Sequence, residues 1–214
     1  MEQWFSFGLV VFTAFFTIIN PFGVMPVFMT MTASLTPEQR RSTAIKAILV
    51  SLITVTLFAF SGNILFDFFG ISVASFRIVG GIIFFLVGYD MLQARFSKMR
   101  IPKDKVAEYV GDISVTPLAI PMIIGPGAIT NAIVLMSDAK TLTHQVAFFV
   151  AVIIVLALVL LILLSATHIM KVLGRTGSKI MMRLMGLIVM VIAIEFFLSG
   201  LKPIIRDIII YVNQ

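Results

Sequence analysis

The stretch IINPFGVMPVF, residues 18–28, lies inside a run of 35 residues, 3–37, that holds no charged side chain. A membrane-spanning helix needs about 20 predominantly apolar residues, so this run is long enough to cross a bilayer. The same stretch holds two prolines and a glycine, and proline removes a backbone donor and clashes with the preceding helical turn. Residues 18–28 therefore predict a membrane-spanning helix that is broken in its middle, next to Asn20.

The rest of the chain has the composition of a membrane protein. Of 214 residues, 60% are hydrophobic and only 12% are charged, and the mean hydropathy is +1.12. A soluble domain carries about twice that share of charged residues. Runs without charge, or with isolated charges, predict an all-α integral membrane protein with six transmembrane helices, at residues 3–37, 47–66, 74–93, 113–137, 146–164 and 180–201.

The basic residues predict the orientation of these spans. The net charge is +6, but twelve of the sixteen basic residues lie in the three alternate loops. Such a bias marks the cytoplasmic side of a membrane protein, so we expect a multi-pass protein of the cytoplasmic (inner) membrane with both termini outside. The same distribution argues against nucleic acid as a partner. The twelve residues are Arg40, Arg41, Lys46, Arg95, Lys98, Arg100, Lys103, Lys105, Lys171, Arg175, Lys179 and Arg183.

Two short matches indicate an internal repeat. The sequence IINP at residues 18–21 aligns with IIGP at 123–126, an offset of 105, and Arg77-x-x-Gly80 aligns with Arg183-x-x-Gly186, an offset of 106. Each half holds three spans, so the second half enters the membrane from the opposite side. We therefore predict two inverted three-helix repeats, residues 1–111 with the cytoplasmic linker and residues 112–214, a plan common among transporters.

The fourth span is predicted to be broken like the first, because it contains Gly125-Pro126-Gly127. Broken helix survives in a bilayer only where protein or a wet cavity covers it. Paired breaks in two repeats are the strongest sequence indication of a transporter's binding site; the alternative is a pair of kinks that only shape the bundle. The predicted substrate-binding residues are Asn20, Pro21, Gly23, Gly125, Pro126, Gly127, Thr130 and Asn131.

Glu195 is a candidate for coupling transport to an ion. It follows Arg183 by twelve residues, which is about 18 Å along a helix and hence deep in the membrane. An ionisable group at that depth suggests function. Proton coupling or cation binding is one interpretation, and a structural hydrogen bond to Asn63 or Arg77 is the other.

Four stretches resemble the MarC family of six-span bacterial and archaeal inner-membrane proteins. They are INPFGVMPVF, FGISVASFRIVGG, VTPLAIPMIIGPGAIT and RLMGLIVMVIAIEF, at residues 19–28, 69–81, 115–130 and 183–196. The family includes SnatA-type transporters of small neutral amino acids. The resemblance implies a secondary transporter of glycine, alanine or serine; the alternatives are an exporter of another small metabolite and a membrane protein without transport activity.

The chemistry of broken helices suits a small zwitterionic substrate. A helix that restarts exposes N–H groups, which suit a carboxylate, and one that ends exposes carbonyls, which suit an ammonium group or a sodium ion. We expect no cofactor and no bound metal, and coupling to Na⁺ or H⁺ and homo-oligomer formation remain open. The chain is not expected to be an enzyme, because Gly88-Tyr89-Asp90 lacks the second carboxylate that an aspartyl protease needs.

Overall fold

The computed structural model describes the backbone of residues 2–93 and 106–212, and these residues form helices without any β-strand. The predicted cytoplasmic loop with the basic residues between 95 and 105 lies outside the described residues. The helices are α1 (Glu2–Ile19), α2 (Pro21–Met31), α3 (Pro37–Phe69), α4 (Val73–Leu92), α5 (Val106–Ile113), the π-type helix η3 (Ser114–Ile123), α6 (Pro126–Asp138) and α7 (Leu142–Val212).

Five helical segments of the described chain are long and apolar enough to span a membrane. The pair Val110–Ile123 and Pro126–Asp138, bent by 62°, passes the same test together and would bring the number to the predicted six if it forms one span. The prediction of an all-helical membrane protein is thereby confirmed. The five segments are Trp4–Met31, Pro37–Phe69, Val73–Leu92, Leu142–Ile169 and Lys179–Ile210.

Local sequence explains where the long helices begin and bend. A capping box at Thr36 and Gln39 starts α3, and Gly70, at φ 62°, ends it. The predicted spans 146–164 and 180–201 are joined by helical turns around a kink rather than by an open loop, so both belong to α7. The kink lies at Gly174, with φ 66° and ψ −177°, a backbone conformation that is essentially restricted to glycine.

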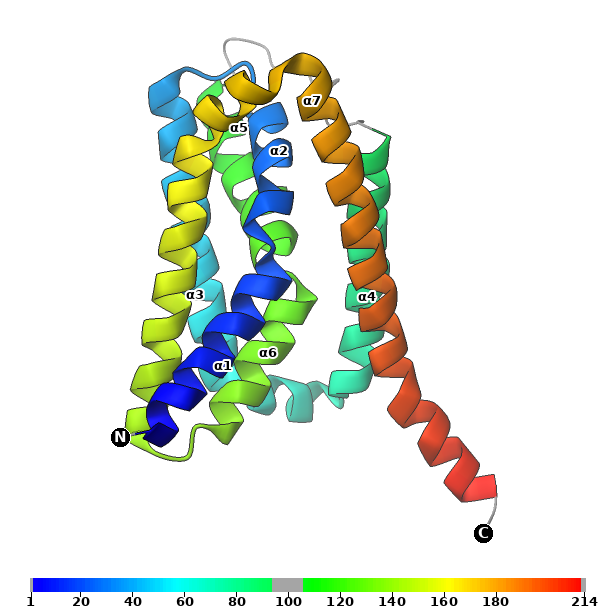
Figure 1. Ribbon diagram of the computed structural model, residues 1–214. Coiled ribbons are helices and arrows are strands. Elements are labelled where there is room, and N and C mark those ends of the chain that lie inside the picture. The colour runs from blue at the N-terminus through cyan, green and yellow to red at the C-terminus, as the bar shows by residue number, and fades with distance from the viewer. Residues whose placement is uncertain (1, 94–105, 213–214) are drawn as a thin grey trace.

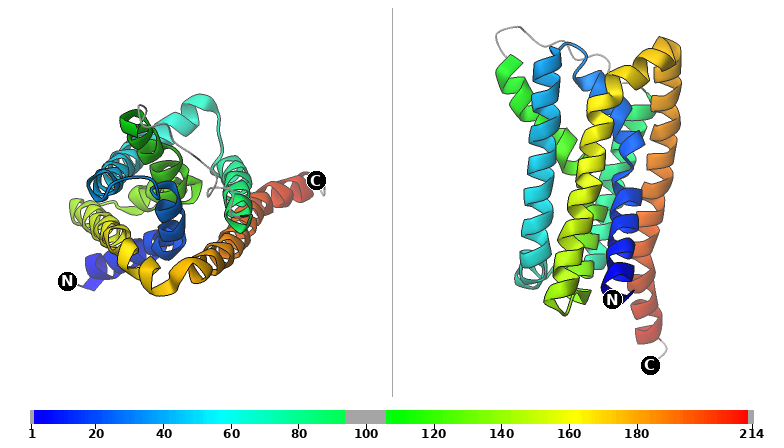
Figure 2. Two further views of the ribbon diagram at one scale, coloured as in Figure 1. Left: turned by 90° about the horizontal axis from the view of Figure 1, so that it is seen from above. Right: turned by 60° about the vertical axis from the view of Figure 1, so that its left-hand side comes forward.

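The helices form one bundle in which α1 begins and α7 ends at the same end (Figure 1). The α2–α3 connection and the bend in α7 lie at the opposite end. Seen from above, α2 lies inside the ring of longer helices (Figure 2). The second half of the chain packs on the first mainly through α4 with α7, while α3 contacts η3, α6 and α7.

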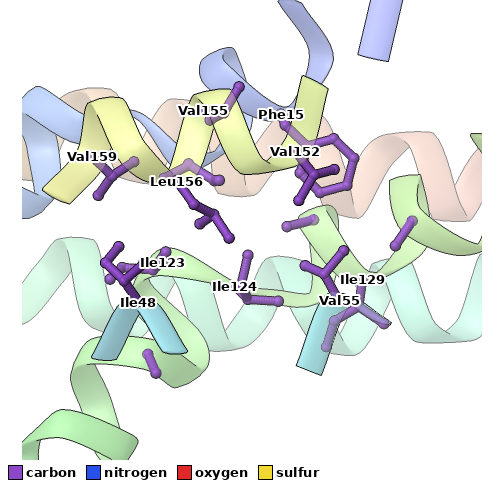
Figure 3. Packing of buried hydrophobic residues seen from close by; sticks show 14 of the residues in the cluster. Phe15, Ile48, Val55, Ile123, Ile124, Ile129, Val152, Val155, Leu156 and Val159 are labelled. Carbon is purple, nitrogen blue, oxygen red and sulfur yellow. The ribbon is translucent and has the colours of Figure 1, made fainter. Parts of the chain in front are cut away.

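The segment between η3 and α6 is enclosed by apolar side chains from two long helices (Figure 3). Ile123, Ile124 and Ile129 lie between α7 on one side and α3 on the other. Their neighbours in this cluster are Ile48 and Val55 of α3 and Val152, Val155, Leu156 and Val159 of α7. Dry packing therefore surrounds this interruption of the chain on at least two sides.

Glycines bring α4 and the second half of α7 into backbone contact. A Cβ atom added to Gly88 would lie 2.9 Å from the carbonyl oxygen of Gly186, and one added to Gly186 would lie 2.8 Å from that of Gly88. These distances are too short for any real Cβ atom. Small residues allow such close packing of membrane helices, which gains dispersion energy that larger side chains would prevent.

We expect Gly88→Leu to destabilise the protein by about 1–3 kcal/mol, the usual cost of overpacking a filled interface. The leucine would have to displace Met190 and the backbone at Gly186. The measurement is the melting temperature of the purified protein in detergent. Val79→Leu, on an exposed face of the same helix, is the control and should melt like the wild type; equal melting of Gly88→Leu would contradict the close contact.

Candidate functional site

The first interruption is a single residue, Asn20, in the left-handed conformation with φ 46° and ψ 70°. Asparagine is among the few non-glycine residues that adopt this conformation readily. Its backbone N–H donates to the carbonyl of Phe16 at 3.1 Å, and its own carbonyl accepts from the N–H groups of Gly23 at 2.8 Å and Val24 at 3.2 Å. The Asn20 backbone is therefore used fully, and its side chain makes no capping hydrogen bond.

The end of α1 is left with carbonyl groups that lack their usual donors. The carbonyl of Thr17 would accept from residue 21, but Pro21 has no N–H. The N–H of Gly23, the usual donor to Ile19, is directed to the Asn20 carbonyl instead. The first interruption therefore presents backbone acceptors.

The second interruption presents backbone donors. Before it, Thr116 and Ile120 have extended backbone inside η3, and the N–H of Ile124 donates to the Ala119 carbonyl at 2.8 Å. After it, α6 begins at Pro126, and the residue at the N-cap position, Gly125, has no side chain that could cap the helix. The first N–H groups of a helix have no partner inside it, so those of Gly127 and Ala128 face the interruption.

The end of α1 contacts the start of α6. Both lie near mid-height of the bundle (Figure 1). A Cβ atom added to Gly127 would lie 3.1 Å from Cγ2 of Ile18, which is two residues before Asn20, and 2.8 Å from Cζ of Phe196 in α7. Glycine at position 127 thus allows the end of α1, the start of α6 and α7 to meet.

A small cavity lies beside Asn20. Its volume is about 20 Å³, little more than the roughly 10–15 Å³ that one ordered water needs. Residues of the first interruption form one side of the cavity. Residues of α4 and α7, and Met122 shortly before the second interruption, form the rest of its lining. The lining includes Asn20, Gly23, Phe84, Val87, Met122 and Ile192.

Phe84 of α4 separates this cavity from the second interruption. Its ring lines the cavity, and a Cβ atom on Gly125 would overlap Cε2 and Cζ of the same ring. One turn earlier in α4, Gly80 makes room in the same way for the ring of Pro126. Sequence reasoning missed Phe84, because one phenylalanine among twenty carries no signal of its contacts.

Two buried hydroxyl groups near the second interruption have no hydrogen-bond partner in the described part of the chain. One is Oγ1 of Thr130 in α6, a predicted site residue, and the other is Oγ of Ser51 in α3. Ser51 was not predicted; it is fully buried and lies about one turn from Ile48 and from Val55, which pack around Ile123 and Ile129 (Figure 3). Buried polar groups without a partner are rare and call for an explanation.

The other predicted residues lie as follows. Pro21 is buried as the first residue of α2, while Asn131 is partly buried in α6, without a hydrogen bond to a described residue. Glu195 is exposed on α7 among the exposed apolar residues Val191 and Leu198. In the described residues Glu195 has no hydrogen bond or ion pair, and Asn63 donates to Ser137 at 2.6 Å. The structure thus places Asn20 and Gly23 on one cavity and packs Gly125 and Gly127 against rings from α4 and α7. It leaves Glu195 on the outer surface.

Five apolar helices long enough to span a membrane, together with one bent helix pair, define a polytopic helical membrane protein. The chain belongs to the MarC family: residues 5–205 match the family described as MarC family integral membrane protein.

Similar proteins come from archaea and bacteria. A UPF0056 membrane protein of Methanocaldococcus jannaschii is 35% identical over 92% of this chain and 97% of its own. The UPF0056 membrane protein YvbG of Bacillus subtilis is 35% identical over 92% and 95% of the two chains, and YhcE of Escherichia coli is 33% identical over 90% and 91%. No solved structure matches the chain significantly.

Proposed function

We propose that this protein is a secondary transporter of small neutral amino acids, such as glycine, alanine and serine, across the cytoplasmic membrane. The substrate binds where the two interrupted spans meet. The alternatives are export of another small metabolite and a membrane protein without transport activity. The transport cycle needs no enzyme chemistry and no cofactor.

The complementary chemistry of the two interruptions carries this proposal. The end of α1 offers the carbonyls of Thr17 and Ile19, which suit an ammonium group, and the start of α6 offers N–H groups at its positive dipole end, which suit a carboxylate. The close approach of Ile18 to Gly127 supports the proposal that one small zwitterion binds between these groups. The Asn20 amide and the hydroxyls of Thr130 and Ser51 add donors and acceptors that are otherwise unused.

The tight packing favours small substrates. Phe84, Phe196 and Ile18 fill the space around Gly125 and Gly127, and the cavity beside Asn20 holds about 20 Å³. An amino acid needs more room than a water molecule, so binding requires a wider conformation than this one. We infer that the structure corresponds to a closed state of an alternating-access cycle. When the site widens in another state of the cycle, we expect it still to exclude amino acids with bulky side chains.

The order of helices supports two inverted repeats. The first half runs from the interrupted pair α1 and α2 through α3 to α4, and the second runs from the interrupted pair η3 and α6 through the two spans of α7. The proposed boundary between residues 111 and 112 falls in α5. Each repeat thus contributes one interrupted span to the site, as in transporters built from inverted repeats.

Counterflow tests the proposal directly. Proteoliposomes that contain the purified protein and unlabelled alanine should accumulate labelled alanine, and external glycine or serine should compete while leucine should not. Liposomes without protein are the control. If alanine counterflow is absent and a different metabolite stabilises the protein in a thermal-shift screen, that metabolite is the better candidate substrate. If no compound stabilises the protein and no counterflow occurs, the protein has no transport activity of this kind.

The topology is a separate prediction. We expect a reporter fused to the C-terminus to be active on the outer side of the cytoplasmic membrane, because the start of α3, which carries Arg40 and Arg41, should face the cytoplasm. A reporter inserted between residues 98 and 99 should be active inside. Cytoplasmic activity of the C-terminal fusion would reverse the proposed orientation.

Glu195→Gln is expected to abolish the response of alanine uptake to an imposed pH gradient while alanine exchange continues, if Glu195 carries the coupling proton. The amide keeps the size of the side chain but cannot ionise. The measurement compares gradient-driven uptake with exchange in the same proteoliposomes, and Asp207→Asn, an exposed carboxylate nearer the end of α7, is the control. Unchanged gradient-driven uptake in Glu195→Gln would remove Glu195 from the coupling mechanism.

A further inference from the structure

A basic hollow lies between the start of α3 and the end of the first span of α7. It is lined by Arg40, Arg41, Leu163, Leu164, Thr167 and His168, and its volume is about 440 Å³. The residues that line the hollow lie at the end of the bundle that holds the α2–α3 connection, whereas the α1–α2 break and the start of α6 lie near mid-height (Figure 1). The hollow is therefore separate from the site proposed for the transported substrate.

Arg40 is fixed in this hollow by two hydrogen bonds to other helices. One terminal nitrogen donates to Oγ1 of Thr167 in α7 at 2.9 Å, and the other donates to the carbonyl of Thr32 after α2 at 3.0 Å. A guanidinium group has five N–H donors, so most of them remain after these two bonds. The Nε donor is buried and has no partner among the described residues.

No acidic residue is among the described residues that line the hollow. Arg40 and Arg41 are adjacent in the lining, and neither forms an ion pair with a described residue. Glu38 lies in the same turn of α3, but it does not line the hollow. A partly buried guanidinium with spare donors beside a second guanidinium is suited to a phosphate, which accepts several charge-assisted hydrogen bonds at once.

One wall of the hollow is apolar and partly exposed. Leu164 is 40% exposed, and it lies in the span Leu142–Ile169, five residues from its end. Arg40 and Arg41 lie in the first turns of the span Pro37–Phe69. The two arginines thus lie at the end of one candidate span, where lipid headgroups are expected, and Leu164 lies farther inside another, where acyl chains are expected. A free anion would contact only the two arginines, whereas a phospholipid would contact the arginines with its headgroup and Leu164 with an acyl chain.

We propose that this hollow binds an anionic phospholipid of the leaflet on the basic side of the protein. Arg41 and the spare terminal N–H groups of Arg40 hold the headgroup phosphate, and an acyl chain lies on Leu164. Basic pockets between membrane helices on the cytoplasmic side bind anionic headgroups in this way. Because Arg40 already joins α3 to α7 and to the end of α2, a lipid bound here stabilises the contact between the two halves of the chain.

The test measures the melting temperature of the purified full-length protein in a neutral detergent. Phosphatidylglycerol should raise the melting temperature in a saturable way, and neither phosphatidylcholine nor inorganic phosphate should do so. Arg41→Gln should weaken the apparent affinity for phosphatidylglycerol by about 10-fold to 100-fold, as expected for losing hydrogen bonds to a charged group. Arg41 is exposed and makes no hydrogen bond with a described residue, so this variant should fold normally.

Lys46→Gln is the matched control, because it removes the same charge from the same helix at an exposed position outside the hollow. It should respond to phosphatidylglycerol like the wild type. An equal response of Arg41→Gln and the wild type would overturn the proposal, and so would stabilisation by inorganic phosphate as strong as that by the lipid. A response to phosphatidylcholine equal to that to phosphatidylglycerol would also overturn it, because the headgroup charge would then play no part.

Discussion

Gly127→Val is expected to abolish the binding and counterflow of alanine while the protein still folds. The first added atom, Cβ, already lies 2.8 Å from the ring of Phe196 and 3.1 Å from Ile18. The two further methyl groups of valine would occupy the point where the end of α1 meets the start of α6. They would cover the free N–H groups of Gly127 and Ala128, which the proposed site uses for the substrate carboxylate.

The matched control for this variant is Gly111→Val. Gly111 is also helical, in α5, and a Cβ atom there would have no neighbour within 4 Å among the described residues. Binding of alanine to detergent-purified protein, measured by calorimetry, and counterflow in proteoliposomes should be normal in this control. If folded Gly127→Val bound alanine with wild-type affinity, the meeting point of the two interruptions would not be the substrate site.

Asn20→Gly is expected to weaken alanine binding by about 1–2 kcal/mol, roughly 5-fold to 30-fold, with little change in stability. The amide is a polar partner at a desolvated site, and losing one such partner costs about this much. Glycine adopts the left-handed conformation of residue 20 without steric cost. The variant therefore removes the side chain and keeps the break.

Asn20→Ala separates the role of the amide from that of the backbone. It loses the same side-chain group, but alanine in the left-handed conformation costs a further 1–2 kcal/mol, approximately, in the folded protein. We expect similar alanine affinity for the two variants and a lower melting temperature for Asn20→Ala alone. Wild-type affinity in Asn20→Gly would show that the amide does not contact the substrate.

The spans of this protein could be predicted from its sequence because lipid leaves few choices. Runs without charged residues locate them, since a charged side chain in the bilayer is costly. The bend between η3 and α6 falls at Gly125-Pro126, where a proline without an N–H follows a glycine. The kink at Gly174 was not predicted from the sequence, because the basic residues around it suggested an open loop. In the structure the helix continues on both sides of the kink.

Contacts between spans could not be predicted. Phe84 and Ser51 lie in spans whose composition is almost uniformly apolar, and nothing along the chain indicates which face of α4 or α3 meets the second interruption. The same holds for Glu195. Its depth could be estimated from Arg183, but its exposure on the outer surface depends on how α7 is rotated against α4.

The glycine contacts between α4 and the second half of α7 have a mechanical consequence. Where Gly88 and Gly186 meet, backbone lies on backbone, so no side chain between the two helices can change rotamer and let one slide past the other. Farther along the pair, Gly81 lies against the backbone of Ala193 and Phe197, and Gly200 lies against the backbone of Ala74. The two helices therefore act as a single stiff arm. Since Phe84 and Phe196 project from that arm onto Gly125 and Gly127, any motion that withdraws one ring from the second interruption also withdraws the other.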